Sequence, residues 1–132
     1  MVKKRIINRI NQGFTLIELL VVLAIIAMLV SMASPRFFRG LEKAKETALK
    51  HDLVTMRESI GQFYADQNRY PHNLDELVQT GYLKAIPVDP ISESLSSWVM
   101  VGPPLGSGQS GVFDVLSGAA GQGSNGISFG NY

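Results

Sequence analysis

The longest pattern in the sequence is an apolar run from Phe14 to Ala33, which holds a single charged residue, Glu18. At about 1.5 Å per helical residue, such a run reaches about 30 Å, the thickness of a membrane's hydrocarbon layer. Glutamate is costly at that depth, so its presence near the start of the run needs an explanation. The pattern predicts a membrane-spanning helix over residues 14–34.

A second helical pattern follows Pro35 and continues to Asp66. We expect the proline to bend or loosen the helix locally. Apolar residues then recur at a spacing near 3.6, with charges on the opposite face, which predicts a face that packs on a globular domain. The predicted apolar stripe consists of Leu41, Ala44, Ala48, Leu53, Met56, Ile60, Phe63 and Tyr64. The cations Arg36, Arg39, Lys43 and Lys45 are interpreted as a solvated face.

The remaining residues predict short elements. Asn73 and Glu76 have the spacing of a capping box, so a short helix should run to about Thr80 and end at Gly81. Two strands are expected, over residues 97–101 and 111–116, joined by a loop rich in glycine, proline and serine. The predicted fold class is α+β: a long N-terminal helix, membrane-spanning in its first half, packed on a small C-terminal antiparallel sheet with glycine-rich loops.

Charge is distributed unevenly around the apolar run. The formal net charge is +1, yet the first 13 residues hold Lys3, Lys4, Arg5 and Arg9 and no acid. The positive-inside rule keeps this block cytoplasmic and places the C-terminal domain across the membrane. The basic charge is therefore on the wrong side for nucleic-acid binding by the folded domain. A secretory signal peptide cut before Ser34 is an alternative, but a disposable segment has no reason to keep Glu18.

The junction Gln12-Gly13-Phe14-Thr15-Leu16-Ile17-Glu18-Leu19 resembles that of type IV pilins and the related pseudopilins. The resemblance implies that prepilin peptidase cuts between Gly13 and Phe14 and methylates the new amine of Phe14. Residues 1–13 would be a cleaved leader, 14–34 the transmembrane and polymerisation helix, and 35–132 a periplasmic or extracellular domain of pilin fold. It also implies that Glu18 pairs with the terminal amine of a neighbouring subunit. From the residues alone, Glu18 could instead reach the headgroups or neutralise its own helix N-terminus.

Motifs in the second half are similar to those of the major, G-type pseudopilin of type II secretion. They are R-Y-P, G-Y-L-K-x-I-P-x-D-P, F-D-V-x-S-G and a final G-N-Y. This implies a structural filament subunit, anchored by one helix in the inner membrane with its domain in the periplasm. The implied partners are further copies of itself, prepilin peptidase, the inner-membrane assembly platform and minor pseudopilins. A subunit of a type IV pilus and a membrane-tethered binding domain that never polymerises are the alternatives.

The sequence departs from the G-type pattern where those relatives hold calcium. Their loop after the last strand carries aspartates, whereas residues 117–128 here contain no carboxylate. The carbonyl of Leu116 and the side chains of Ser117 and Asn125 are the available oxygens, and an uncharged set binds calcium weakly. We therefore predict that no calcium or other cofactor is bound, and that turns and glycine conformations hold the loop.

No pattern predicts catalysis. His51 and His72 have no cluster of cysteine, aspartate or glutamate at ligand spacing, and the loop serines have no histidine arranged with them. The pair Asp75-Glu76 is explained by helix capping, and Trp98 by packing of a strand. Without a cysteine there is no thiol chemistry. The sequence thus predicts no catalytic, cofactor-binding or metal-binding residue.

Overall fold

The computed structural model describes residues 13–132, which fall into two compact units. One unit ends at Phe38, and the other spans Arg39–Tyr132. The leader cations Lys3, Lys4, Arg5 and Arg9 lie outside the described residues. The predicted division into leader, membrane segment and exported domain depends on a peptidase and a membrane, and it stays a prediction.

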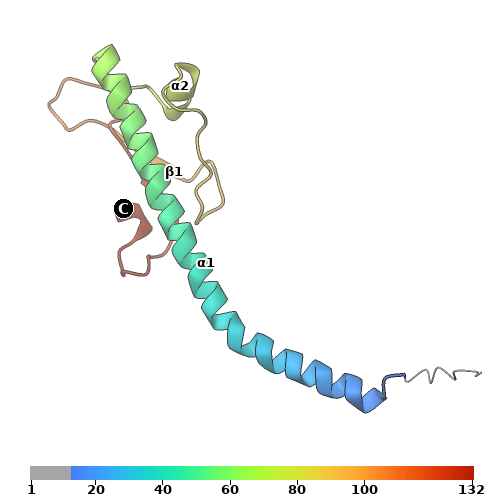
Figure 1. Cartoon of the computed structure of the whole chain (residues 1–132). Coiled ribbons are helices and arrows are strands. Elements are labelled where there is room, and N and C mark those ends of the chain that lie inside the picture. Colours follow the sequence, from blue (N-terminus) through green and yellow to red (C-terminus); the bar gives the residue numbers. More distant parts are fainter. Residues whose placement is uncertain (1–12) are drawn as a thin grey trace, which may run out of the picture. The chain divides into compact units, whose positions relative to one another are not determined.

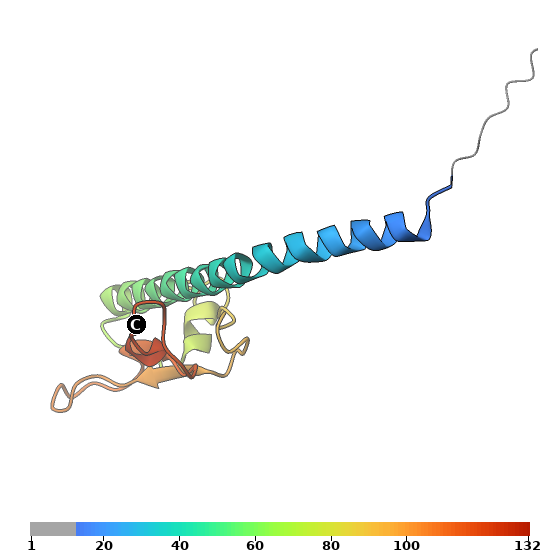
Figure 2. The same ribbon diagram turned by 90° about the horizontal axis from the view of Figure 1, so that it is seen from below.

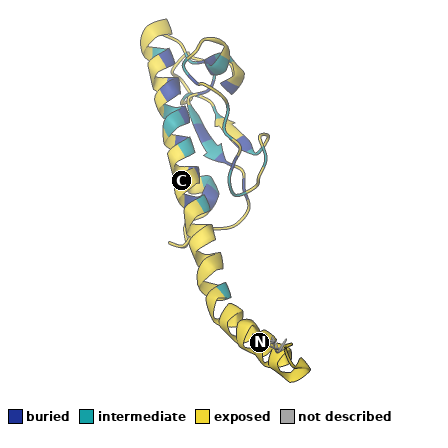
Figure 3. Ribbon diagram, turned by 45° about the vertical axis from the view of Figure 1, so that its right-hand side comes forward, coloured by how far each residue is buried: buried dark blue, intermediate teal, exposed yellow. Residues whose placement is uncertain are grey.

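Helix α1 spans Leu16–Gln67 and contributes to both units. Pro35 lies inside it, and helical backbone continues on both sides. In the first unit the side chains from Gly13 to Ala33 are exposed, as the yellow part of the ribbon shows (Figure 3). The helix predicted from Phe14 to Asp66 is therefore present, with its bounds shifted by two residues at the start and one at the end.

The core of the second unit forms on one face of α1. Leu53, Met56, Ile60 and Phe63 are buried there, as their spacing predicted. The beginning of the predicted stripe was wrong: Leu41 is 45% exposed, and Ala44 and Ala48 are exposed too. The buried face instead runs through Glu46 and Leu49, because the C-terminal residues of the chain cover α1 there rather than at Leu41. The spacing of apolar residues alone does not determine which side of each helical turn another segment of the chain will bury.

Helix α2, Leu74–Gln79, adds Leu74 and Leu77 to this core. Its N-terminus is capped as expected, since the Asn73 side chain accepts a hydrogen bond of 2.9 Å from the Glu76 N–H. The Glu76 carboxylate bonds the N–H of His72 and the guanidinium of Arg69, each at 2.6 Å. After the capping residue Thr80, Gly81 has a φ of +82°, a conformation that favours glycine. The prediction of this helix is confirmed.

A two-stranded antiparallel sheet lies beside the C-terminal half of α1 (Figure 1). Strand β1 is Trp98–Val101 and β2 is Asp114–Ser117, with Trp98 opposite Ser117 and Val101 opposite Asp114. Together with the long helix this confirms the predicted α+β, pilin-like architecture. The loop between the strands extends out beyond both of them (Figure 2). A short 3-10 helix, η1, spans Phe129–Asn131.

The second strand begins three residues later than predicted. Gly111 has a φ of +113°, and the Val112 N–H donates to the Pro71 carbonyl at 2.8 Å. The backbone at Val112 is therefore hydrogen-bonded to the segment that follows α1, and pairing with β1 as a strand starts only at Asp114. In β1 the prediction for Trp98 is confirmed: its side chain is 8% exposed, and its Nε1 donates to the Pro87 carbonyl at 2.8 Å.

Candidate functional site

The N-terminal site begins with a capped helix. Residues Gly13 to Thr15 are not helical, and the Thr15 hydroxyl accepts a hydrogen bond of 3.2 Å from the Glu18 N–H. The Thr15 carbonyl accepts from the Leu19 N–H at the same distance. Thr15 is thus the N-cap of α1. The T-x-x-E spacing was visible in the sequence as the start of a capping box, and the sequence reasoning missed it.

The segment after this cap presents apolar side chains in every direction. All large apolar residues between Phe14 and Met32 are at least 44% exposed. None of the most apolar stretch of α1 is buried. Because burial of each such side chain is worth about 1.5–3 kcal/mol, exposure of the whole surface to water would cost tens of kcal/mol. By length and composition this helix can cross a membrane, and lipid or further helices must cover it.

Glu18 lies in the first turn of α1 with its side chain exposed. No cation of residues 13–132 comes within ion-pair distance of its carboxylate. The negative charge does lie at the positive end of the helix dipole, which is favourable. A Cβ added at Gly13 would meet open space. Within residues 13–132 of one chain, then, no packing contact requires either the glycine or the carboxylate.

A second group of polar side chains fastens the C-terminal loop, residues 118–132, to α1. Glu46 projects from α1 and is 6% exposed. Its Oε2 accepts from the N–H of Ser124 at 3.0 Å and from the Ser124 hydroxyl at 2.8 Å. Its Oε1 accepts from the Tyr132 hydroxyl and from Lys50 Nζ, the latter at 3.3 Å. Lys50 also lies 4.6 Å from the centre of the Tyr132 ring.

These bonds set the protonation of the group. The hydrogen bond from Tyr132, followed by those from Ser124, lowers the pKa of Glu46 to about 2. Desolvation, followed by the bond to Glu46, raises the pKa of the Tyr132 hydroxyl above its usual value. Both shifts favour a charged carboxylate that accepts from a neutral phenol. The sequence analysis did not single out Glu46, because its partners are 78 and 86 residues away along the chain.

A buried carboxylate, Asp89, joins the segment after α2 to the sheet. Its side chain is fully buried. One oxygen accepts from the N–H groups of Ile91 and Ser92 at 2.8 and 3.2 Å. The other accepts from the Ser97 and Ser117 hydroxyls at 3.3 and 2.6 Å. The P-x-D-P motif was noted in the sequence, but only the fold reveals this role for its aspartate.

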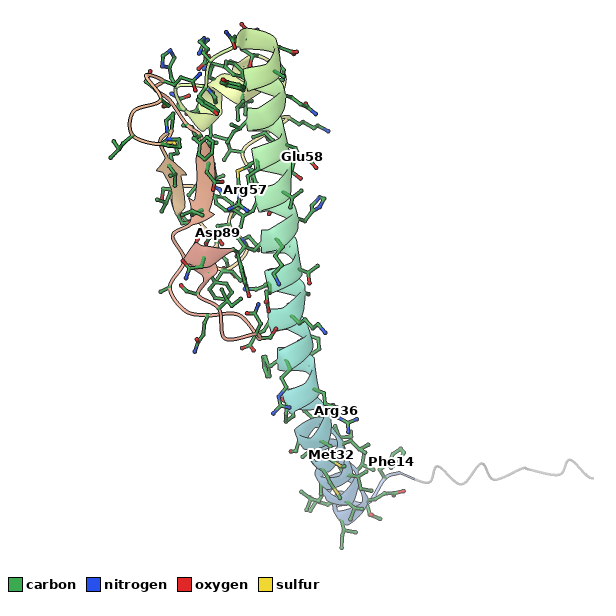
Figure 4. All side chains as sticks on the ribbon, turned by 90° about the vertical axis from the view of Figure 1, so that its left-hand side faces the viewer. Phe14, Met32, Arg36, Arg57, Glu58 and Asp89 are labelled. Atoms are coloured by element: carbon green, nitrogen blue, oxygen red, sulfur yellow. The ribbon has the colours of Figure 1, made fainter. Side chains whose placement is uncertain are left out.

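Arg57 ties the sheet to the helix. Its side chain points from α1 towards the strands, and Glu58 next to it is exposed (Figure 4). Arg57 Nε donates to Asp114 at 2.7 Å, and Nη2 donates to the main-chain oxygens of Val115 at 3.0 Å and Tyr132 at 2.7 Å. One guanidinium therefore holds both β2 and the end of the described chain.

The residues considered for calcium have other partners within the fold. The Ser117 hydroxyl, 2% exposed, donates to Asp89 and accepts from the Ala119 N–H. Asn125 Oδ1 accepts from the Ile127 N–H at 3.0 Å and lies 2.9 Å from the Tyr132 hydroxyl. Leu116 lies within the β ladder opposite Val99. In the part of the chain from residue 13 onward, no three His, Cys, Asp or Glu side chains gather as metal ligands. The residues present do not fit the ion.

The two histidines belong to neither polar group. His51 and His72 are both exposed, one on α1 and the other before α2. The imidazole of His72 is not used in capping, because the bond to Glu76 comes from its main-chain N–H. Two serines, Ser97 just before β1 and Ser117 at the end of β2, are hydrogen-bonded to Asp89 and serve the fold.

Comparison with known proteins places these features in a family context. Residues 8–34 match the family model described as the prokaryotic N-terminal methylation motif. The type II secretion system core protein G of Aeromonas hydrophila is 31% identical over 126 residues, which cover 83% of each chain. The protein of the same description from Escherichia coli strain K12 is 30% identical over 123 residues, 81% of this chain and 80% of its own.

A similarity of narrower extent connects the chain to pili. The type IV major pilin protein PilA of Myxococcus xanthus is 34% identical over 70 residues, which cover 53% of this chain but only 32% of the pilin. No solved structure matches the chain.

Proposed function

Because the chain belongs to the family of the type II secretion system core protein G, the major pseudopilin, we propose that it is the structural filament subunit of such a system. The observation that carries the proposal is similarity to core protein G along about four fifths of both chains. The methylation motif and the uncovered apolar half of α1 agree with it. In this proposal the apolar side chains face lipid before assembly and neighbouring helices afterwards.

Processing comes first in the proposed sequence of events. Prepilin peptidase cuts between Gly13 and Phe14 and methylates the Phe14 amine. The cut removes the four leader cations and keeps the apolar helix, so the mature chain stays in the inner membrane with its domain in the periplasm. The non-helical backbone of residues 13–15, which ends at the Thr15 cap, supports this step, since a peptidase needs unwound substrate.

Glu18 then has a role that no single chain explains. Moving its carboxylate among packed helices is unfavourable unless a cation reaches it. In the filament, the new amine of Phe14 on a neighbouring copy supplies that cation. A misplaced neighbour would leave both charges unpaired, so the pair sets the register of each incoming subunit. Further partners in the proposal are the inner-membrane assembly platform and minor pseudopilins.

Two alternatives differ in observable ways. A type IV pilus subunit would produce fibres on the cell surface, and the similarity to PilA, confined to a third of that pilin, favours it less. A tethered binding domain would not need Glu18. We propose no catalytic activity, since the relatives are named as core proteins of a secretion system and the polar groups described above all serve the fold.

Mass spectrometry of the purified chain tests processing. We expect a mature N-terminus at Phe14 that carries one methyl group, and little cleavage of Gly13→Val because the added side chain blocks the peptidase pocket. The matched control is Gly40→Val, which leaves the junction intact and has open space around its Cβ. A mature chain that starts at Ser34 would support the secretory signal peptide instead.

Replacement of Glu18 tests assembly. We expect Glu18→Ala to insert and be cleaved at near wild-type levels but to lose filaments, counted by electron microscopy of the filament fraction. Thr15→Ala is the control, because it removes the cap at the same helix start and keeps the charge. Normal filament levels in Glu18→Ala would refute the pairing and favour the tethered domain.

A further inference from the structure

The C-terminal loop is held against α1 through one carboxylate. Both oxygens of Glu46 are occupied, by two donors of Ser124 on one side and by Tyr132 and Lys50 on the other. Among the described residues, the N–H of Ser124 has no other acceptor than this carboxylate. A buried acceptor with four donors is a complete site, and removal of its charge leaves those donors without their partner.

Gly123 provides independent evidence that the contact is tight. A Cβ at this position would lie 2.6 Å from Glu46 Oε1 and would also collide with the Tyr132 hydroxyl. The backbone of Gly123 does not have a positive φ, so a side chain is excluded by these contacts and not by conformation. The loop backbone thus lies directly against the Glu46 carboxylate and the Tyr132 hydroxyl, which would have to shift to admit a side chain here.

The surroundings of Glu46 oppose a divalent cation. A hollow of about 580 Å³ beside it is lined by Arg39, Lys43 and Lys45, with Glu42 as the other acid. Lys50 already contacts the carboxylate. Calcium would have to displace Lys50 and Tyr132 and then sit among further cations, with Glu42 as the only other acid that lines the hollow.

From these contacts we propose that Glu46 is a built-in anchor of the C-terminal loop, which it holds closed without a metal ion. The carboxylate on α1 does here what the resemblance to G-type pseudopilins assigns to calcium. Loop closure in this protein is therefore independent of the calcium concentration of its compartment. This inference concerns the loop alone and stands whether or not the chain forms a secretion filament.

Hydrogen–deuterium exchange of the full chain in detergent tests the proposal. The readout is the exchange rate of peptides from residues 118–132, with calcium chloride or with EGTA. For the wild type we expect equal rates in both buffers. For Glu46→Gln we expect at least tenfold faster exchange that calcium does not reverse. The matched control is Glu42→Gln, one turn earlier on α1 and lining the same hollow, which should behave as wild type.

Two further measurements keep the result interpretable. Peptides from α1 around Leu53 and Phe63 should exchange as slowly in Glu46→Gln as in the wild type, which shows that the core is intact. If Glu46→Gln does not fold, Tyr132→Phe removes a single donor and should give a smaller acceleration. The proposal is overturned if EGTA speeds loop exchange in the wild type tenfold. It is equally overturned if, in the variant that folds, the loop exchanges at the wild-type rate.

Discussion

Replacement of Asp89 by asparagine should destabilise the second unit far more than its small change in shape suggests. Asparagine must keep its oxygen facing the N–H groups of Ile91 and Ser92, since its NH₂ cannot accept from them. The NH₂ then faces Ser97 and Ser117, whose hydroxyls now donate to Asp89. The Ser97 hydroxyl has another acceptor, the Ser94 carbonyl at 3.3 Å. The Ser117 hydroxyl, 2% exposed, loses its acceptor.

The magnitude follows from these bonds. One buried donor without a partner costs about 1–3 kcal/mol, and the exchange of charge-assisted bonds for neutral ones adds about 1 kcal/mol. A loss of about 2–4 kcal/mol in the free energy of unfolding lowers the midpoint of a unit of this size by about 10–25 °C. Ser117→Ala removes one of the four donors to Asp89, and its unfolding midpoint should be about 4–8 °C below that of the wild type.

The assay is thermal unfolding of the full chain in detergent, followed by the fluorescence of Trp98. This is the only tryptophan, it is buried, and it pairs with Ser117 across the sheet, so it reports on the unit that contains Asp89. Glu58→Gln, at an exposed carboxylate in the middle of α1, is the control and should match the wild type. If Asp89→Asn melts within about 3 °C of the wild type, the hydrogen-bond argument is refuted.

Other measurements probe different parts of the same unit. The pKa values of Glu46 and Glu76 are both lowered to about 2, by the bonds from Tyr132 and Ser124 and by those from Arg69 and His72. The contribution of these two carboxylates to stability is therefore complete above their ordinary pKa of 4.5 and is lost as the pH falls towards 2. The urea midpoint of the wild type should drop over that pH range, and that of Glu46→Gln should drop less. Desolvation raises the pKa of Asp52, so this group instead contributes stability at low pH that is lost as the pH rises. Gly111→Ala should lose about 1–3 kcal/mol, since φ is +113° and the new Cβ would lie 2.6 Å from the Pro71 carbonyl. Gly61→Ala, inside α1 with open space around it, should gain about 0.5–1 kcal/mol, and an equal loss at both sites would contradict the distinction.

The sequence by itself determined the features that depend on near neighbours. The apolar run identifies the part of α1 that is long and apolar enough to cross a membrane, because length and hydrophobicity can be read from consecutive residues. Asn73 and Gly81 define α2 because a cap and a left-handed turn need only the residues beside them. The proposed cleavage between Gly13 and Phe14 likewise depends only on local sequence, since a peptidase would recognise a short stretch of chain. The Thr15 cap belongs to this class too and was simply overlooked.

Tertiary structure decided everything that joins distant segments. Periodicity predicted a buried face on α1, but whether it starts at Leu41 or at Glu46 depends on where the C-terminal loop returns to the helix. The second strand begins at Asp114 because Pro71 holds the residues before it. Three charged side chains, those of Glu46, Arg57 and Asp89, each have at least one hydrogen-bond partner between 28 and 86 residues away along the chain. Charged side chains carry no periodic signal of such pairing. Their roles follow only from the topology that brings the segments together.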